Sequence, residues 1–251
     1  MKIETLSTFP WMFDSVMNSS IMARAQSKGL LDFTAHDLRD YTHDKHRSTD
    51  DEPYGGGHGL VMKCDPIFEA YDAIVGTSAM KPLTIFLTPW GRRLDDALVD
   101  ELTTQEHLLF ICGHYEGIDE RAYALSDLNI SLGDYVLSSG ELASMVVIDA
   151  VVRKIPGVLG NASSMIDESF ENALLEYPSY TRPQCFRDME VPAVLCSGNH
   201  AHIEQWRHEQ RLKRTFRLRP DLLEKAQLSE KDYEFLKQLS AEEPKLFGAN
   251  E

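Results

Sequence analysis

The sequence predicts an α/β fold with a largely parallel sheet, followed by a small, mainly helical second domain. Three observations predict it. Strand-like segments alternate with helical patterns through the first two-thirds of the chain, glycine-rich loops follow some of these segments, and a polar stretch precedes a proline-broken region with helical periodicity. Strands that alternate with helices are typical of a parallel sheet with helices covering it.

The composition is that of an ordered globular protein. The 251 residues are 43% hydrophobic, and 25 Lys and Arg against 40 Asp and Glu give a net charge of −15. These values exclude disordered, collagen-like and low-complexity classes. No apolar run approaches the roughly 18 to 20 residues of a membrane span, and the first five residues are unlike a signal peptide. Four widely spaced cysteines indicate reduced thiols, so we expect a cytoplasmic protein with no membrane partner and no zinc site.

Each predicted element follows from its residue pattern. β-branched and aromatic content predicts strands at 2–8, 30–35, 83–88 and 108–112, with a weaker candidate at 129–137. Helical periodicity predicts helices at 11–27, 66–75, 94–103 and 140–154. Ligands of such sheets bind at the carboxyl ends of the strands, which is where we expect the functional loops.

A polar segment divides the chain. Residues 161–171 are polar and follow a long apolar helix, so they predict a linker between a domain at 1–160 and a helical domain at 172–251. In the second domain the helical patterns lie at 201–214 and 228–239.

Three glycine-rich loops are candidates for ligand binding, at residues 54–59, 113–119 and 133–141. Taken singly, such a loop is more often a tight turn than a site. None is a P-loop or a dinucleotide fingerprint. Together on an α/β frame they favour a site in which backbone amides and carbonyls hold a nucleoside.

A basic segment contrasts with the acidic total. Residues 207–219 contain six Arg or Lys and one Glu, a local charge of +5, so the other residues sum to −20. From charge alone a solvated helix face is the more common explanation, and a phosphate-binding surface is the alternative.

Seven motifs resemble one known family. They occur in order between about residues 3 and 225: THDKHR (42–47), DDEPYGGGHG (50–59), CGHYEGIDER (112–121), GDYVL (133–137), IPGVLG (155–160), YTRP (180–183) and SGNH (197–200). Together they resemble TrmD, the bacterial tRNA (guanine-N(1)-)-methyltransferases of the SPOUT class. The resemblance implies a deep trefoil knot and an obligate homodimer with an active site shared between subunits. It also implies methyl transfer from S-adenosylmethionine to ring nitrogen 1 of guanosine at tRNA position 37.

Residue by residue, the resemblance implies a donor pocket on the glycine-rich loops and on the end of a strand. The donor-binding residues that it implies are Phe86, Leu87, Thr88, Pro89, Gly113, Tyr115, Glu116, Gly117, Leu132, Gly133, Asp134, Tyr135, Val136, Leu137 and Gly140.

The resemblance also implies the catalytic residues. Arg153 matches an arginine that stabilises negative charge developing on the guanine carbonyl oxygen, although a helix C-terminal cation is the plain structural alternative. The family's general base is an Asp directly before Ser-Phe, and here Ser169-Phe170 follow Asp167-Glu168. Alignment favours Glu168, and Asp167 is a rival if the linker shifts by one residue.

Other matches concern departures from the family pattern and the tRNA. His114, Ser139 and Ala143 stand where Arg, Gly and Pro are common. The basic segment, His46, Arg47 and Asp50 are candidates for tRNA contact, and Asn199 and His200 for ordering the linker. Trp90, Tyr54 and Tyr115 are candidates for stacking on an extruded base.

Three other functions remain open at this point: methylation of a ribose hydroxyl, a catalytically silent RNA-binding module, and a small-molecule nucleotide enzyme. A magnesium requirement has been linked to the family, and the sequence shows scattered carboxylates but no dedicated metal cage.

Overall fold

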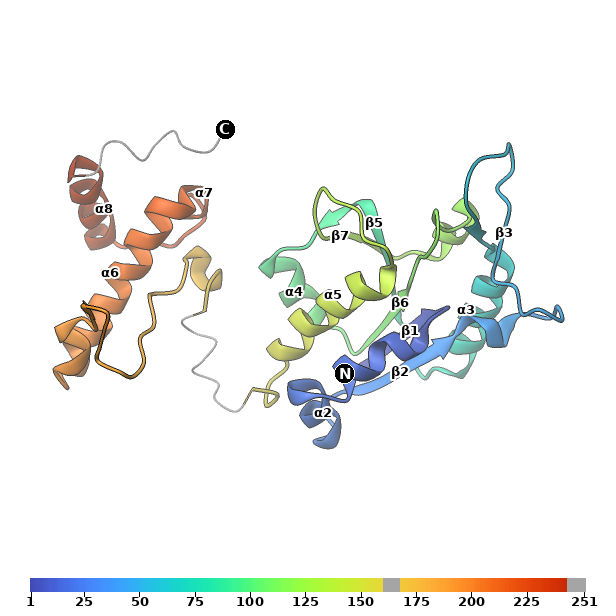
Figure 1. Ribbon diagram of the computed structural model, residues 1–251, viewed down its shortest axis with the longest axis horizontal. Helices are drawn as coiled ribbons and strands as arrows, with labels where there is room; N and C mark the ends of the chain where they lie inside the picture. Colours follow the sequence, from blue (N-terminus) through green and yellow to red (C-terminus); the bar gives the residue numbers. More distant parts are fainter. Residues whose placement is uncertain (160–167, 243–251) are drawn as a thin grey trace. The chain divides into compact units, whose positions relative to one another are not determined.

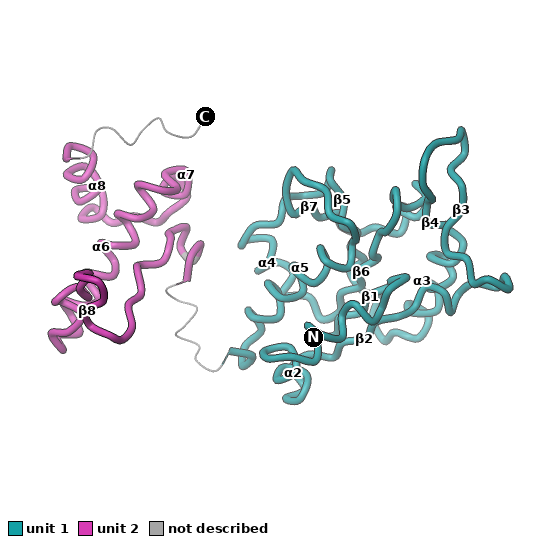
Figure 2. The backbone as a smooth tube through the Cα atoms, in the orientation of Figure 1, with its two compact units in different colours: residues 1–160 teal, residues 161–251 magenta. Residues whose placement is uncertain are grey.

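The computed structural model describes residues 1–159 and 168–242, and the chain forms two compact units. Unit 1 spans Met1–Gly160 and unit 2 spans Asn161–Glu251 (Figure 2). Unit 1 contains the glycine-rich loops, and unit 2 contains Glu168 and the basic segment.

Unit 1 is built around a parallel sheet (Figure 1). Its described strands run in the order β2-β1-β6-β5-β7, and every pairing is parallel. The strands are β1 (Lys2–Ser7), β2 (Asp32–Asp37), β5 (Leu83–Arg93), β6 (His107–Ile111) and β7 (Leu128–Ser131). All of β6 is buried, as its apolar run predicts for a central strand that is covered on both faces. The predicted α/β class with a parallel sheet is confirmed.

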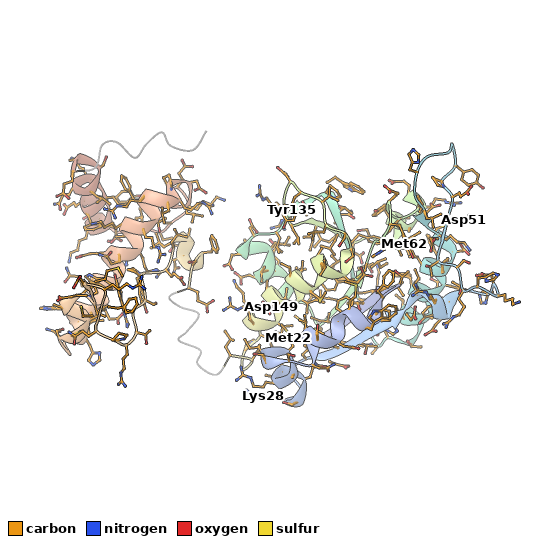
Figure 3. All side chains as sticks on the ribbon, viewed as in Figure 1. Met22, Lys28, Asp51, Met62, Tyr135 and Asp149 are labelled. Carbon is orange, nitrogen blue, oxygen red and sulfur yellow. The ribbon has the colours of Figure 1, made fainter. Side chains whose placement is uncertain are left out.

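Helices cover both faces of this sheet. Packed against one face are η1 (Pro10–Phe13), α1 (Asp14–Met17), α2 (Ser20–Ser27), α4 (Asp96–Thr103) and α5 (Gly140–Lys154). Against the other face are η2 (Leu38–Tyr41), α3 (Cys64–Thr77) and η3 (Glu120–Leu125). Neighbouring residues of one strand face opposite cores. Phe110 belongs to the same hydrophobic cluster as Met22 of α2 (labelled in Figure 3), whereas Ile111 belongs to the cluster that contains Ile67 of α3.

Several elements differ from their predicted bounds. The helix predicted at 11–27 is interrupted around Asn18 and Ser19, because these short polar residues favour caps and turns over helix interiors. The strand predicted at 129–137 ends at Ser131, and a loop follows from Leu132 to α5. β5 is longer than predicted and contains an irregularity between Leu87 and Arg92.

A short hairpin carries the triple glycine. β3 (Asp50–Asp51) pairs antiparallel with β4 (Val61–Met62), and residues 52–60 connect them. The hairpin is anchored to the loop after β6 through Met62, whose backbone N–H donates to Gly117 (2.9 Å) and whose carbonyl accepts from Asp119 (2.9 Å).

Unit 2 consists mainly of helices in its described part. Its elements are η5 (Glu171–Ala173), β8 (Cys185–Phe186), β9 (Met189–Glu190), η6 (Ala193–Cys196), α6 (His200–Leu218), α7 (Pro220–Leu223) and α8 (Glu230–Glu242). Asn199 caps α6 by accepting from the backbone N–H of His202, and a 2.6 Å contact between His208 and Asp232 joins α6 to α8. None of the described helices has the length and apolar content that a membrane crossing requires.

Candidate functional site

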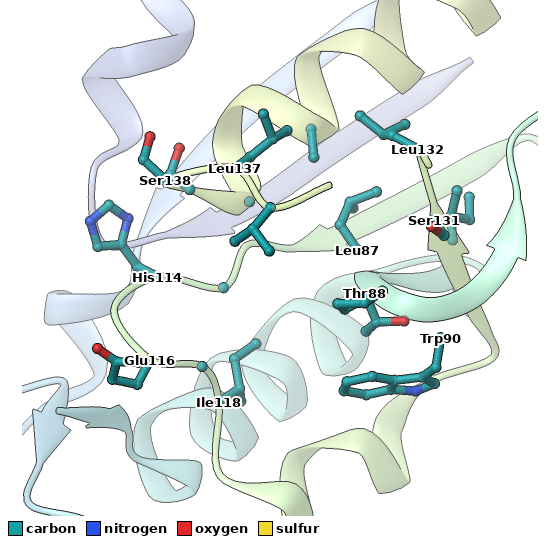
Figure 4. Close-up of a pocket in the computed structure, with 18 of the residues that line it drawn as sticks. Leu87, Thr88, Trp90, His114, Glu116, Ile118, Ser131, Leu132, Leu137 and Ser138 are labelled. Atoms are coloured by element: carbon teal, nitrogen blue, oxygen red, sulfur yellow. The ribbon is translucent and has the colours of Figure 1, made fainter. Parts of the chain in front are cut away.

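A cavity of about 430 Å³ opens at the carboxyl edge of the sheet (Figure 4). Three chain segments supply most of its lining: the second half of β5 from Leu87 to Trp90, the loop after β6 from Gly113 to Ile118, and the segment from Ile130 to Gly140, which comprises the end of β7 and the loop after it. Since β5, β6 and β7 are parallel neighbours, their carboxyl ends meet there, as expected for a ligand site on such a sheet.

Close backbone contact joins two of these segments. The Gly140 N–H, at the start of α5, donates to the Gly113 carbonyl at 2.7 Å. A Cβ atom on Gly140 would lie 2.6 Å from the backbone nitrogen of Gly113, which is closer than real Cβ atoms approach. Glycine is therefore required at position 140 for α5 to begin against the loop after β6.

The loop after β6 is shaped by backbone conformation and by neighbouring carboxylates. Tyr115 has a positive φ of 58°, and burial followed by the nearby Asp50 carboxylate raises the pKa of its phenol. At the end of the loop Asp119 accepts two hydrogen bonds from the Arg121 guanidinium, at 2.9 and 2.7 Å. These bonds lower the pKa of Asp119 to about 2, so its carboxylate stays charged and caps η3.

Two hydroxyl groups at the cavity are buried without a partner among the described residues. They are Thr88 Oγ1 and Ser139 Oγ, and their residues are 5% and 6% exposed. An unsatisfied buried hydroxyl costs free energy, so such groups at a cavity indicate a polar ligand that completes their hydrogen bonds.

Most of the donor-binding residues implied by the resemblance meet at this cavity. Those that line it are Leu87, Thr88, Pro89, Gly113, Tyr115, Glu116, Gly117, Leu132, Gly133, Tyr135, Val136, Leu137 and Gly140. Phe86 lies outside the lining, because its side chain is on the opposite side of β5, fully buried against Tyr123 and α3. Asp134 lies in the same loop as the lining residues but is also outside the lining.

Of the implied catalytic residues in unit 1, Arg153 is not in this lining. Arg153 is in the last turn of α5, whereas Gly140 at the cavity begins that helix. The helix between them rises by about 20 Å. Glu168 is half-buried and belongs to unit 2, and Asp167 lies outside the described residues.

Further lining residues were not expected as donor contacts. Trp90 and Tyr123, whose rings meet edge to face at 5.3 Å, lie at the cavity with Ile118, Glu120, Ile130, Ser131 and Ser138. Trp90 could have been predicted to line the cavity if β5 had been predicted to continue past Pro89, because the strand then extends along the carboxyl edge of the sheet. Tyr123 comes from η3, and no local motif marks it.

The basic segment forms much of α6, but several of its cations are engaged within unit 2. Arg211 is 7% exposed, and Arg207 lies over the Tyr177 ring at 4.8 Å while pairing with Glu204 at 2.7 Å. Arg219 pairs with Asp221 at 2.7 Å. The outward-facing charge is therefore smaller than the local +5 indicates.

Other residues named as tRNA candidates are largely exposed. Tyr54 is fully exposed at the hairpin connection, and Trp90 is 63% exposed. Arg47 pairs with Asp40, and His46 is exposed nearby.

A family model for tRNA (guanine-1)-methyltransferase TrmD matches residues 1–225. This chain belongs to the TrmD family. Among its curated TrmD relatives are proteins named tRNA (guanine-N(1)-)-methyltransferase from Bacillus cereus, Bacillus anthracis and Bacillus thuringiensis subsp. konkukian. Each is 49% identical over 241 residues, which cover 95% of this chain and 98% of the relative. The TrmD match includes all three lining segments of the cavity, and the resemblance seen in the motifs is confirmed.

Proposed function

We propose that this TrmD-family chain is a tRNA (guanine-N(1)-)-methyltransferase that binds S-adenosylmethionine in the cavity at the carboxyl edge of the sheet. Membership of the family supports the reaction, methylation of guanine N1 in tRNA. The observation that supports the site best is the meeting of two motif-bearing segments and the second half of β5 around one cavity, with two buried hydroxyls that have no partner among the described residues.

The residues present fit this donor. A volume of about 430 Å³ lies within the range of roughly 300–1,000 Å³ that is usual for small-molecule sites. Leu87, Leu132 and Leu137 provide apolar walls for an adenine ring, and Thr88 Oγ1 and Ser139 Oγ provide hydrogen-bond partners. We assign donor binding to the thirteen lining residues named above, with Phe86 supporting β5 from the opposite face. A donor contact by Asp134 stays a prediction from the resemblance.

The chemistry needs a group that removes a proton from the target nitrogen. S-adenosylmethionine supplies a methyl group bonded to a positively charged sulfur. In our proposal the carboxylate of Glu168, or of Asp167, accepts the N1 proton of guanine. The Arg153 guanidinium stabilises the negative charge that deprotonation places on the carbonyl oxygen.

An active site shared by two chains accounts for the position of Arg153. With about 20 Å of helix separating it from Gly140, Arg153 is at the wrong end of α5 to serve the cavity of its own chain. We therefore propose a homodimer in which Arg153 and the linker carboxylate act at the partner's cavity.

Other parts of the proposal rest on the family. They are the trefoil knot, position 37 as the target, binding of tRNA by unit 2, and action in the cytoplasm. A magnesium requirement stays a prediction from the resemblance, and the described residues contain no group of three His, Cys, Asp or Glu side chains arranged to hold a metal ion.

Primer extension on a methylated transcript tests the proposal. An unmodified tRNA with guanosines at positions 36 and 37 is incubated with S-adenosylmethionine and the protein, and the methylated ring nitrogen then stops the polymerase. We expect a stop at position 37 that Glu168→Gln abolishes and Asp167→Asn preserves.

The other outcomes separate the alternatives. Loss with Asp167→Asn instead would assign the base to Asp167 and leave the reaction unchanged. If the tRNA binds but the wild-type protein gives no stop, the enzyme proposal is wrong and a silent RNA-binding module is favoured. Methylated ribose without a stop would indicate a 2′-hydroxyl target.

A further inference from the structure

A buried carboxylate lies directly behind the cavity. Glu141, in the first turn of α5, is fully buried, and its Oε1 accepts a hydrogen bond from Ser7 Oγ at 2.5 Å. Ser7 ends β1, and its Oγ also accepts from the Phe9 backbone N–H at 2.8 Å. Glu141 thus connects the start of α5 to the end of a strand outside the cavity.

The second carboxylate oxygen faces His114. Glu141 Oε2 and His114 Nδ1 are 3.6 Å apart, too far for a hydrogen bond, and each is buried without a partner among the described residues. His114 lines the cavity, and its side chain is 22% exposed. Glu141 Oε2 is a hydrogen-bond acceptor and His114 Nδ1 can be a donor, so the two atoms could satisfy each other.

The surroundings of His114 restrict how its ring can move. The ring packs on Phe9, with centroids 4.5 Å apart, and meets Tyr115 edge to face at 4.8 Å. The backbone N–H of His114 donates to Met62 Sδ at 3.2 Å. A charge-assisted hydrogen bond needs about 2.7–2.9 Å, so a shift of the imidazole by under about 1 Å would bring Nδ1 within reach of Glu141 Oε2.

We propose that His114 and Glu141 are a positioning pair for the methyl donor. This inference rests on the proposed function, since it concerns the same cavity. When the donor is bound, the His114 Nδ1–H donates to Glu141 Oε2 and fixes the Gly113–Gly117 loop against α5. A fully buried carboxylate with one unsatisfied oxygen is costly, and closure of the loop removes that cost. The pair touches neither the methyl group nor the guanine, so it acts through the loop that it holds.

The test measures the donor dissociation constant by titration calorimetry on the full chain without tRNA. His114→Phe keeps a ring on Phe9 but has no donor, whereas His114→Asn keeps an N–H group near the position of Nδ1. We expect His114→Phe to weaken S-adenosylmethionine binding about tenfold, and His114→Asn to stay within about threefold of wild type.

Glu141→Gln completes a double-mutant cycle. This variant should also weaken donor binding about tenfold, and Glu141→Gln/His114→Phe should be no worse than either single variant, because all three lack the same interaction. In steady-state methylation the KM for the donor should rise by a similar factor while kcat stays within about twofold. If Glu141→Gln fails to fold, the comparison of Phe with Asn at position 114 still decides the question.

Three results would overturn the pair: equal binding by His114→Phe and wild type, equal weakening by Phe and Asn, or additive effects in the cycle. Each leaves the proposed function intact as long as the wild-type protein binds the donor. A wild-type protein that does not bind S-adenosylmethionine would instead refute the proposed donor site, and the pair with it.

Discussion

At position 140 the side chain is a single hydrogen atom, and the geometry of the cavity depends on it. The Gly140 N–H reaches the Gly113 carbonyl at 2.7 Å, and a methyl group there would collide with the Gly113 backbone nitrogen and crowd the Cys112 Cα atom. Backbone atoms cannot rotate away as a side chain can, so either α5 or the loop after β6 would have to move.

Gly140→Ala should therefore weaken S-adenosylmethionine binding by about tenfold or more. It should also lower the free energy of unfolding by about 1–3 kcal/mol. Calorimetric titration and urea denaturation measure the two effects.

Gly76→Ala is the matched control for that substitution. Gly76 lies in the last turn of α3, and an added Cβ there meets nothing within 4 Å. It should leave donor binding unchanged and stabilise the protein by about 0.5 kcal/mol. Equal donor affinity in the two variants would show that the close contact at Gly140 is dispensable.

Much of the candidate site could be predicted residue by residue, and the exceptions have physical reasons. Gly113, Gly133 and Gly140 were found because glycine in a loop after a strand is a local signal. Phe86 was named with its neighbours, but successive strand residues face opposite sides, so its side chain is in the core and that of Leu87 faces the cavity. The pairing of Glu141 with His114 joins residues from different elements, which no local pattern reveals.

Among the elements, β1, β2 and β6 are joined by a polar cluster inside the sheet. Glu4 of β1 is 4% exposed and contacts Lys2 Nζ at 2.8 Å, His36 of β2 at 2.8 Å and His107 of β6 at 2.6 Å. Burial raises the pKa of Glu4, but the hydrogen bonds from Lys2, His36 and His107 together outweigh it and lower the pKa below 4.5. The ionised carboxylate is thus favoured in the folded state.

This lowered pKa predicts how stability depends on pH. A carboxyl whose pKa is lower when folded stabilises the protein above its unfolded pKa, and that stabilisation is lost as the pH falls through the folded value. Glu4→Gln should cost about 2 kcal/mol near pH 7, and the difference from wild type should shrink at about pH 3. Urea denaturation at both pH values measures this, with the exposed Glu106→Gln as a control expected within about 0.5 kcal/mol of wild type. If Glu4→Gln lowers the free energy of unfolding by the same amount at both pH values, the stabilisation by Glu4 does not come from its negative charge.

The predicted elements agree with the structure where a pattern is long and uninterrupted. The apolar periodicity of 140–154 gives the bounds of α5, and the apolar run at 108–111 gives β6. The helix predicted at 11–27 was wrong across Asn18 and Ser19, where side-chain hydrogen bonding competes with the helix: Ser19 Oγ donates to the Ser15 carbonyl at 2.6 Å. The β3–β4 hairpin was missed, since its two-residue strands are too short to show an alternation.

For the molecule as a whole, an acidic chain must bind a polyanion. The net charge of −15 repels tRNA at long range, so we propose that binding depends on the local cations of the basic segment. Arg217 is exposed near the end of α6, and Lys237 is exposed on α8, outside that segment.

Arg217→Ala should therefore weaken tRNA binding and reduce the slope of log Kd against log salt by about 1, whereas Lys237→Ala should change neither. Filter binding between about 50 and 200 mM salt measures the slope. Donor binding without tRNA should be the same in both variants. If Arg217→Ala and Lys237→Ala weaken tRNA binding equally, the residues that contact tRNA are not confined to the basic segment.

The order of strands in the sheet differs from their order in the chain, and this has a consequence for synthesis on the ribosome. β1 and β2 are complete once residue 37 has been made, but β6, the other neighbour of β1, begins at His107. At usual translation rates that interval lasts roughly 4 to 14 s. During it the β6 partner of β1 has not yet been made, and in the folded sheet β6 lies between β1 and β5, which is made earlier. The second edge of β1 can therefore be paired only after the apolar strand β6 has been made.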